Sequence, residues 1–600
     1  MDDRARPEAH ARATKFATPV SRPPVAPFQL DALRSLDRHI VASVAKVTGG
    51  FSPAAIGLAF LDWAAHLASA PGRRMELGLD AFQEISRLSA LQLRPEAATD
   101  AESAPELRDD ERFRDDAWQK APYRQWAQNF LAMEGWWQRS THDVAGVSPH
   151  HEDVVSFAIR QSLDVFAPTN LPVTNPEVAA ETLRSGGRNL ATGLSNLVED
   201  VRRVQAGQRP VGAEAFQVGR DVATTPGKVV FRNRLMELIQ YEPATKTVHA
   251  EPILIVPAWI MKYYILDLSP GNSLIRHLVE KGHTVFCISW RNVTAEDRDL
   301  SLDDYRNLGV VAALDAVSAI LPDRKIHAAG YCLGGTLLAL AAAAMVEVVD
   351  ERLASMTLFA AQTDFTEPGE LQLFIDDSEV SFLESMMWEH GTLDSSQMAG
   401  AFQLLNSRDL VWSRMVHNYL MGRRIPMNDL MAWNADATRM PFRMHSEYLR
   451  KFFLGNDLAS GRVIVDGRPI MLQNIRAPIF AVGTERDHVA PWQSVYKIHY
   501  LADTDVTFVL TNGGHNAGIV SEPGHPHRHF RIASKAADDH CLSADEWFDV
   551  TPAQDGSWWV AWTHWLAQHS SAKKVPPPLM GGSQDNAPLV DAPGTYVLQT

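Results

Sequence analysis

The sequence has little cysteine and no long apolar run free of polar residues. Its 600 residues include three cysteines, Cys287, Cys332 and Cys541. Three cysteines cannot form the paired framework of a disulfide-stabilised secreted protein, so a reducing compartment is expected. The charged N-terminus is not followed by the apolar core of an export signal. The most apolar early stretch, residues 53–70, contains an aspartate and a histidine in mid-run, which predicts a buried amphipathic helix rather than a membrane span.

An excess of basic charge is also missing. Lys and Arg together number 56 against 72 for Asp and Glu, which gives a formal charge of -16. Contacts with phosphates need a basic face, so nucleic acid is not an expected partner. Hydrophobic residues make up 46% and charged residues 21%, which is the composition of a globular protein. The length allows two to four domains, or one large domain with additions.

The two ends of the chain differ in character from the rest. Residues 1–28 are rich in Pro, Ala and Arg and have no periodicity, so a disordered tail is predicted. In residues 29–211, apolar residues recur at three- and four-residue steps, which predicts a helical N-terminal domain. Residues 575–600 are Pro- and Gly-rich and then apolar. This C-terminal tail either frays or docks on the body of the protein.

Between these regions the pattern is that of an α/β protein. From residue 212 to 574, short apolar runs alternate with helical stretches, which indicates a parallel sheet with helices on both faces. The predicted strands are 228–231, 235–241, 252–256, 284–289, 326–329, 356–360, 478–482 and 506–510. The alternation breaks between about 361 and 454, where helices and loops are expected. Such an insertion at the carboxyl ends of parallel strands predicts a helical cap over an active site.

The most informative motif is GYCLGG at residues 330–335, which lies between a predicted strand and an Ala/Leu-rich helix. This is the context of a nucleophile elbow, with Cys332 in the position that serine holds in G-x-S-x-G. A helix N-terminus there would favour the thiolate, and the amide of Leu333 would be one oxyanion donor. The alternative is an ordinary buried cysteine in a glycine-rich turn.

Partners for the cysteine occur downstream in the order nucleophile, acid, histidine. Asp487 and His515 each follow a predicted strand, which is where a triad acid and base belong. A second oxyanion donor is expected in the loop after strand 252–256, from the amide of Ile260 or of Trp259.

Other histidines are assigned no catalytic role. His488 adjoins Asp487, and because neighbouring side chains rarely point the same way, a structural role is predicted. The tract of His525, His527 and His529 is interrupted by proline and arginine and has no matching cysteine or carboxylate pattern. No metal site is therefore predicted, and the role of the tract stays open.

With these motifs in place, the chain resembles the class I polyhydroxyalkanoate synthases from about residue 30 to 600. The matching blocks are APTN at 167–170, TNPE at 174–177, TTPGKVVF at 224–231, KYYILDL at 262–268, SWRN at 289–292, the cysteine turn, WNAD at 433–436, DHVAPW at 487–492 and DAPGTYV at 591–597. The resemblance implies an α/β-hydrolase fold and a polymerase of (R)-3-hydroxyacyl-CoA, with 3-hydroxybutyryl-CoA as the expected substrate. It also implies a homodimer on the surface of cytoplasmic polymer granules, with no cofactor beyond the CoA of the substrate.

In the mechanism that the resemblance implies, His515 deprotonates Cys332, which attacks the thioester and releases CoA. Asp487 either orients His515 or helps to activate the 3-hydroxyl of the incoming acyl group. Three positions depart from the family pattern: Val293 and Ala258 replace prolines and Met261 replaces an asparagine. The last two changes lie in the proposed oxyanion loop, so the preferred acyl chain length and the specific activity stay open. The dimer geometry and the open or closed state of the cap stay open as well.

Two alternative functions are carried beside this one. A cysteine-nucleophile polyester depolymerase or thioesterase could use the same fold and triad. A weakly catalytic granule-coating protein could bind polymer through the cap.

Overall fold

The computed structural model describes residues 27–48, 50–93, 107, 109–394, 407–582 and 588–600. The predicted tail at residues 1–28 lies almost wholly outside the described residues. The boundaries predicted at 28, 211 and 574 stay predictions.

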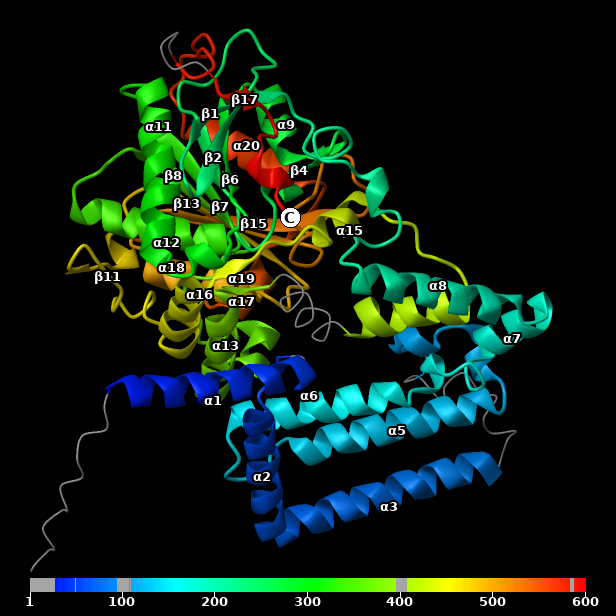
Figure 1. Ribbon diagram of the computed structural model, residues 1–600. Helices are drawn as coiled ribbons and strands as arrows, with labels where there is room; N and C mark the ends of the chain where they lie inside the picture. Colours follow the sequence, from blue (N-terminus) through cyan, green and yellow to red (C-terminus); the bar gives the residue numbers. More distant parts are fainter. Residues whose placement is uncertain (1–26, 49, 94–106, 108, 395–406, 583–587) are drawn as a thin grey trace, which may run out of the picture.

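An eleven-stranded sheet forms the centre of the molecule (Figure 1). In spatial order its strands are β16 (Ala553–Asp555), β15 (His529–Lys535), β14 (Val506–Thr511), β13 (Ile479–Thr484), β8 (Leu353–Phe359), β7 (Ile326–Tyr331), β3 (Ile253–Val256), β6 (Val285–Trp290), β2 (Met236–Tyr241), β1 (Gly227–Arg232) and β17 (Val590–Asp591). The strands from β14 to β6 pair in parallel, and those on either side of them pair antiparallel. The parallel strands are buried along most of their length, because helices cover both faces.

Two apolar clusters hold these helices on the sheet. On one face, α11 (Ala312–Ile320), α12 (Leu333–Glu347), α17 (Trp492–Tyr496) and α18 (Ile498–Leu501) share an apolar cluster with Leu254 and Val256 of β3. On the other face, α9 (Leu274–Glu280) and α20 (Trp558–Gln568) share a cluster with Ile253 and Ile255. The alternation along β3 follows from the two-residue repeat of a strand.

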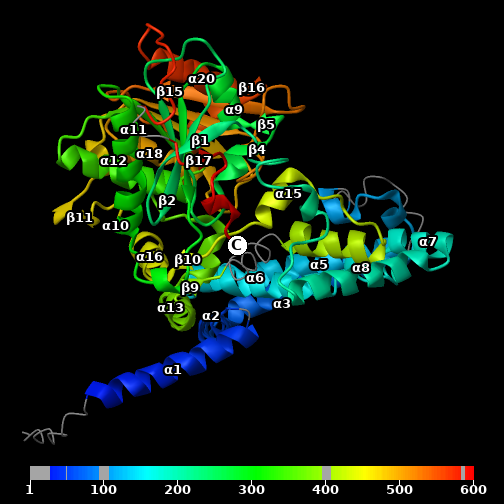
Figure 2. The ribbon, with the colours of Figure 1, turned by 45° about the horizontal axis from the view of Figure 1, so that its top comes forward.

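The N-terminal region is helical, and most of it lies at one end of the molecule, away from the sheet (Figures 1 and 2). Its helices are α1 (Pro27–Thr48), α2 (Pro53–Ser69), α3 (Pro71–Leu93), α5 (Tyr123–Thr141), α6 (Pro149–Val165), α7 (Pro176–Ser185) and α8 (Arg188–Gln205). α7 begins with a proline at its first helical position, and the Asn175 side chain accepts hydrogen bonds from the first-turn amides. No helix among the described residues combines the length and apolarity that crossing a membrane requires.

The segment between β8 and β13 is the predicted helical insertion. Its described helical elements are η9 (Gly369–Phe374), α13 (Asp377–His390), η10 (Arg408–Ser413), η11 (Val416–Leu420), α15 (Asp429–Asn434), α16 (Phe442–Tyr448), η12 (Leu449–Leu454) and η13 (Leu472–Asn474). A short ladder of β9 (Thr392–Leu393) and β10 (Met440–Pro441) was not predicted.

The insertion contacts the N-terminal helices at two places. α13 packs along α1, and η11 packs on α8 so closely that a Cβ on Gly193 would lie 1.7 Å from the carbonyl oxygen of Tyr419. Asn189 Nδ2 donates to the carbonyl of Leu420 at 2.8 Å across the same contact. The cap is therefore attached to the N-terminal region as well as to the sheet.

The C-terminal segment docks rather than frays. β17 pairs with β1, and the amides of Thr595 and Tyr596 donate to the buried carboxylate of Glu237 at 2.9 and 3.0 Å. The Tyr596 hydroxyl also donates to the carbonyl of Asn233 at 2.7 Å.

Candidate active site

Cys332 lies in the sharp turn between β7 and the first residue of α12, with φ 52° and ψ -123°. A positive φ is unusual for a residue with a side chain and marks local strain, as a nucleophile elbow requires. The turn is tight because glycines stand on both sides of the cysteine. A Cβ on Gly334 would lie 2.1 Å from the carbonyl oxygen of Val256, and one on Gly330 would lie 2.4 Å from the Cα of Gly335.

Hydrogen bonds fix the backbone on both sides of the nucleophile. The Cys332 amide donates to the carbonyl of Phe359 at 2.9 Å, and its carbonyl accepts from the Gly335 amide at 2.9 Å. Leu333 is the first residue of α12, so its amide has no acceptor inside the helix. The half-buried Cys332 side chain therefore lies at a helix N-terminus that favours negative charge.

Asp487 and His515 are brought together from the loops after β13 and β14. His515 Nδ1 lies 2.8 Å from Asp487 Oδ2. The Asp487 side chain is 0% exposed and that of His515 is 14% exposed. Asp487 also accepts from the Thr484 hydroxyl at 2.9 Å and from the amides of Val489 and Ala490 at 2.9 and 2.8 Å. Four donors thus hold the carboxylate in one orientation.

The charges at this site shift the pKa of both partners. Burial alone would raise the pKa of Asp487, but the charge and hydrogen bond of His515 and the two backbone amides outweigh burial and lower it. Burial alone would lower the pKa of His515, but Asp487 and the adjacent Cys332 thiolate outweigh it and raise that pKa well above its usual value. Because Nδ1 faces Asp487, the other ring nitrogen, Nε2, remains for the cysteine. These shifts favour a charged pair of His515 imidazolium and Asp487 carboxylate.

The loop after β3 lies beside the nucleophile turn, because Gly334 packs directly on it. The Thr438 hydroxyl donates to the carbonyl of Trp259 at 2.6 Å, and the Thr438 amide donates to the carbonyl of Ile260 at 3.2 Å. In a trans peptide the N–H points opposite to the C=O, so the Ile260 amide points away from Thr438. Ile260 lines the same cavity as Cys332 and Leu333.

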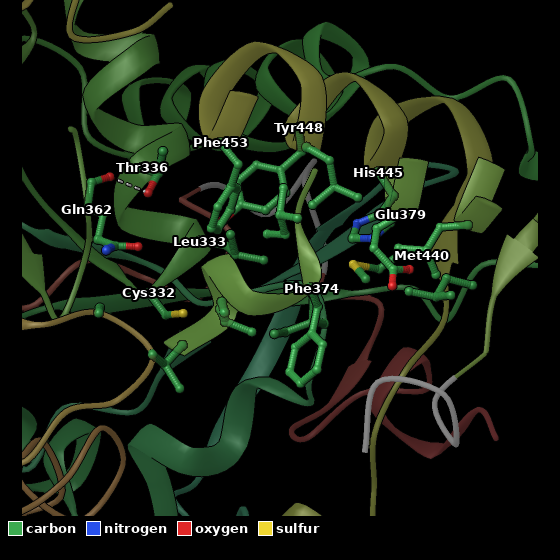
Figure 3. A pocket seen from close by; sticks show the side chains of 18 of the residues that line it. Cys332, Leu333, Thr336, Gln362, Phe374, Glu379, Met440, His445, Tyr448 and Phe453 are labelled. Carbon is green, nitrogen blue, oxygen red and sulfur yellow. Dashed lines mark hydrogen bonds between the residues drawn. The ribbon is translucent and has the colours of Figure 1, made fainter. Parts of the chain in front are cut away.

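An apolar cavity of about 140 Å³ opens beside Cys332 (Figure 3). Phe374, Tyr448 and Phe453 of the cap line it, as do Gly50 and Phe51 of the N-terminal region. Residues 50 and 51 were not predicted to belong to the site, because no local pattern links a turn between two helices to a distant cysteine.

Two titratable side chains, Glu379 and His445, line the cavity and lie well apart from Cys332 in Figure 3. Both oxygens of Glu379 accept from the Ser52 amide at 3.0 Å. Burial, with a smaller contribution from Asp376, raises the pKa of Glu379 to about 7. Burial lowers the pKa of His445 to about 4, and its Nδ1 has no hydrogen-bond partner among the described residues. Neither residue was identified from the sequence.

The remaining sequence candidates lie elsewhere. The His488 side chain is 56% exposed and lies 4.0 Å from Glu370. Cys287 is buried in β6. His529 Nε2 lies 3.5 Å from Glu485 Oε1, whereas His525 is half-buried and its Nδ1 contacts the carbonyl of Pro526. Among the described residues, no three potential metal ligands come together.

Comparisons with known proteins bear on the family and the fold of the chain. The chain matches family models described as "Poly-beta-hydroxybutyrate polymerase N terminal" over residues 31–73, "Poly-beta-hydroxybutyrate polymerase (PhaC) N-terminus" over 109–278 and "alpha/beta hydrolase fold" over 251–522. The last match confirms the predicted α/β-hydrolase fold.

Curated relatives cover most of the chain. It is 39% identical to a poly(3-hydroxyalkanoate) polymerase of Methylorubrum extorquens, over 81% of this chain and 80% of the relative. It is 37% identical to the poly(3-hydroxyalkanoate) polymerase subunit PhaC of Rhizobium meliloti, over 82% and 80%. The corresponding subunit of Cupriavidus necator is 35% identical over 92% of both chains.

Proposed function

The chain belongs to the poly(3-hydroxyalkanoate) polymerase family, and from this premise we propose that it polymerises (R)-3-hydroxyacyl-CoA through an acyl-Cys332 intermediate. Members of the family are acyltransferases. The observation that carries the proposal is the strained turn of Cys332 at a helix N-terminus, together with the His515–Asp487 pair 2.8 Å apart.

In the first step, His515 Nε2 accepts the Cys332 proton, and the thiolate attacks the thioester carbonyl. The tetrahedral intermediate carries an oxyanion, for which the amides of Leu333 and Ile260 are the proposed donors. Collapse of the intermediate breaks the C–S bond to CoA. The CoA thiolate leaves with the proton from His515, and the acyl group remains on Cys332.

In the second step, His515 deprotonates the 3-hydroxyl of the next acyl unit, which attacks the acyl-Cys332 carbonyl. An ester forms and the Cys332 thiolate is released. We assign Asp487 to orienting His515 in both steps. Its complete burial and its four donors support this role, because a carboxylate so enclosed has no free oxygen for an incoming hydroxyl.

The family resemblance supports three further elements of the proposal. The chain acts as a homodimer, it attaches to the surface of the polymer granule that it extends, and it does so in the cytoplasm. The CoA of the substrate is the one small molecule that the reaction requires, and 3-hydroxybutyryl-CoA is the first substrate to test.

The test is incubation of the purified protein with 3-hydroxybutyryl-CoA, with free CoA, free acid and polymer measured together. CoA release with polymer supports the proposal. CoA release with free acid would assign a thioesterase or depolymerase instead, and no release would leave a coating protein. Cys332→Ala is the control, and we expect it to lose activity by a factor on the order of a million.

A further inference from the structure

The N-terminal helical region forms part of the wall of the catalytic cavity. Gly50 and Phe51 line the cavity that holds Cys332, although they belong to the turn between α1 and α2. Phe51 packs on Phe374 of the cap, with ring centroids 5.0 Å apart and planes tilted by 47°. The aromatic ring of Phe51 therefore stands between the cap and the N-terminal helices at the edge of the cavity.

The turn that carries Phe51 is closed by its own hydrogen bonds. The Thr48 hydroxyl donates to the carbonyl of Phe51 at 2.7 Å, and the Gly50 amide donates to that of Ala45 at 2.9 Å. Gly50 has φ 94°, which favours glycine over residues with a side chain. These bonds hold Gly50 and Phe51 against the end of α1 before any contact with the cap is counted.

The next residue, Ser52, joins this turn to the cap. Its amide donates to both carboxylate oxygens of Glu379, each at 3.0 Å. Its hydroxyl lies 3.1 Å from that of Ser378 and accepts from the Ala55 amide at 3.3 Å. Ser52 is 2% exposed and Glu379 is 4% exposed, so water does not compete for these bonds.

The packing of α1 on α13 supports the same placement. The Arg38 guanidinium lies 4.8 Å from the centre of the Trp388 ring, and the ring of His39 meets Trp388 edge-on at 5.8 Å. Phe51 is therefore held on both sides, by the packed helices before it and by Ser52 after it.

The cavity is small enough for its wall to limit the length of the acyl group that can enter. At about 140 Å³, it is close to an engineered apolar cavity of about 150 Å³ that binds benzene. Such a space accepts an acyl group with a short side chain and excludes one with several more methylenes. The lining as a whole is predominantly apolar, so the cavity selects mainly by the length of the acyl side chain.

We propose that Phe51 is a specificity-determining residue, whose ring closes the cavity beside Cys332 and limits the length of the acyl side chain that the enzyme accepts. The contact between Ser52 and Glu379 holds Phe51 in that place. This inference rests on the proposed function and names a determinant of substrate choice within it.

The experiment compares kcat/KM for 3-hydroxybutyryl-CoA and 3-hydroxyoctanoyl-CoA in the wild type, Phe51→Leu and Phe51→Ala. We expect the ratio to shift toward the longer substrate by about tenfold or more in Phe51→Ala, because one methylene in an apolar pocket discriminates by roughly 10–200-fold. Phe51→Leu should shift it less. Phe157→Ala is the matched control, since Phe157 packs on the same Phe374 at 5.7 Å but does not line the cavity.

Two variants of Glu379 test how Phe51 is held. Glu379→Ala removes the acceptor of the Ser52 amide and should shift the ratio in the same direction as Phe51→Ala. Glu379→Gln keeps a carbonyl oxygen that can accept this bond and should shift it less. An unchanged ratio in Phe51→Ala, in an enzyme that releases CoA from the shorter substrate, would overturn the inference and leave the proposed function standing.

A second measurement does not depend on turnover. Alkylation of Cys332 by N-ethylmaleimide and N-hexylmaleimide is followed by mass spectrometry of the peptide that contains it. We expect Phe51→Ala to raise the relative rate with the longer reagent by about tenfold, in line with the same pocket discrimination, and Phe157→Ala to leave it unchanged. Such a shift in a protein that releases no CoA would refute the proposed function but support Phe51 as part of the cavity wall. If the relative rate does not shift, Phe51 does not limit access to Cys332.

Discussion

At the level of single residues, the hydrogen bond between Asp487 and His515 predicts that the two side chains act together, and substitutions of either one test this. We expect Asp487→Asn and His515→Gln both to lose acylation of Cys332 and chain growth. The corresponding Asp→Asn change in a serine protease lowers kcat about 10⁴-fold by stabilising the wrong histidine tautomer.

Single-turnover mixing with a labelled acyl-CoA, followed by quenching, measures enzyme-bound acyl and released CoA. Stoichiometric acylation in Asp487→Asn with slow elongation would move Asp487 from orienting His515 to serving the 3-hydroxyl. Rapid acylation in His515→Gln would exclude His515 as the base.

The strained backbone of Cys332 has a consequence for stability that is separate from catalysis. At φ 52° the backbone conformation is unfavourable for any residue with a Cβ atom, and glycine has none. The variant Cys332→Gly should therefore unfold at a higher temperature than Cys332→Ala. Strain at such a position is worth about 1–3 kcal/mol, part of which is offset by the larger entropy of glycine in the unfolded chain. Thermal unfolding followed by circular dichroism measures the difference. Equal midpoints would show that the turn is not strained as described.

At the level of elements, the contact between α8 and η11 depends on the missing side chain of Gly193. A Cβ there would lie 1.7 Å from the carbonyl oxygen of Tyr419, so Gly193→Ala should push the two helices apart and destabilise the fold by roughly 1–3 kcal/mol, as overpacking does.

Gly57 in α2 is the matched control, because a Cβ there meets nothing within 4 Å. Gly57→Ala should be neutral or stabilising by up to about 1 kcal/mol. Thermal midpoints of the two variants, with limited proteolysis between η10 and α15, test the difference. An unchanged midpoint in Gly193→Ala would contradict the close contact.

The central strands, and with them the loops that carry Asp487 and His515, could be predicted from the sequence. A parallel strand buried on both faces is a continuous apolar run, so the runs at 326–329 and 506–510 coincide with β7 and β14. β15 was missed, because its residues HFRIASK are mostly half-exposed and show neither an apolar run nor a clear alternation.

Chain order and strand ends were enough to propose Cys332, Asp487 and His515 as a triad, whereas they gave no indication of the cavity. Phe51, Glu379 and His445 come together only through the packing of α1 and the cap. Packing between distant helices leaves no local pattern in the sequence. Likewise, the docking of the C-terminal segment on β1 was one of two open alternatives until its partners, Glu237 and Asn233, were seen.

At the level of the whole molecule, buried histidines make the free energy of unfolding depend on pH in the acid range. Burial is the main cause that lowers the pKa values of His277, His327, His445 and His499 to about 4 and that of His283 to about 3. The unfolded chain binds protons at these positions below about pH 6.5. Stability is therefore fully present above pH 6.5 and falls as the pH drops toward 4, by up to about 1.4 kcal/mol per pH unit for each histidine.

His327 is the position to test, because its ring nitrogens contact the hydroxyls of Ser355 and Ser570 at 2.7 and 3.0 Å, and Gln can bond to both. We expect the thermal midpoint of His327→Gln to depend less steeply on pH between 6.5 and 4 than that of the wild type. The exposed His564 is the control, and His564→Gln should keep the wild-type slope. An identical slope in all three proteins would mean that His327 takes up no proton on unfolding.

The hydrogen bond between Ser52 and Glu379 joins two residues that the ribosome adds at widely separated times. At about 5–20 residues per second, the ribosome adds residue 379 roughly 15 to 65 s after residue 52. Throughout that interval the turn with Phe51 has no cap to pack on, and Cys332 is translated before Asp487 and His515. The nascent chain therefore carries a thiol without its activating base, and the wall of the cavity closes only after translation has passed the cap.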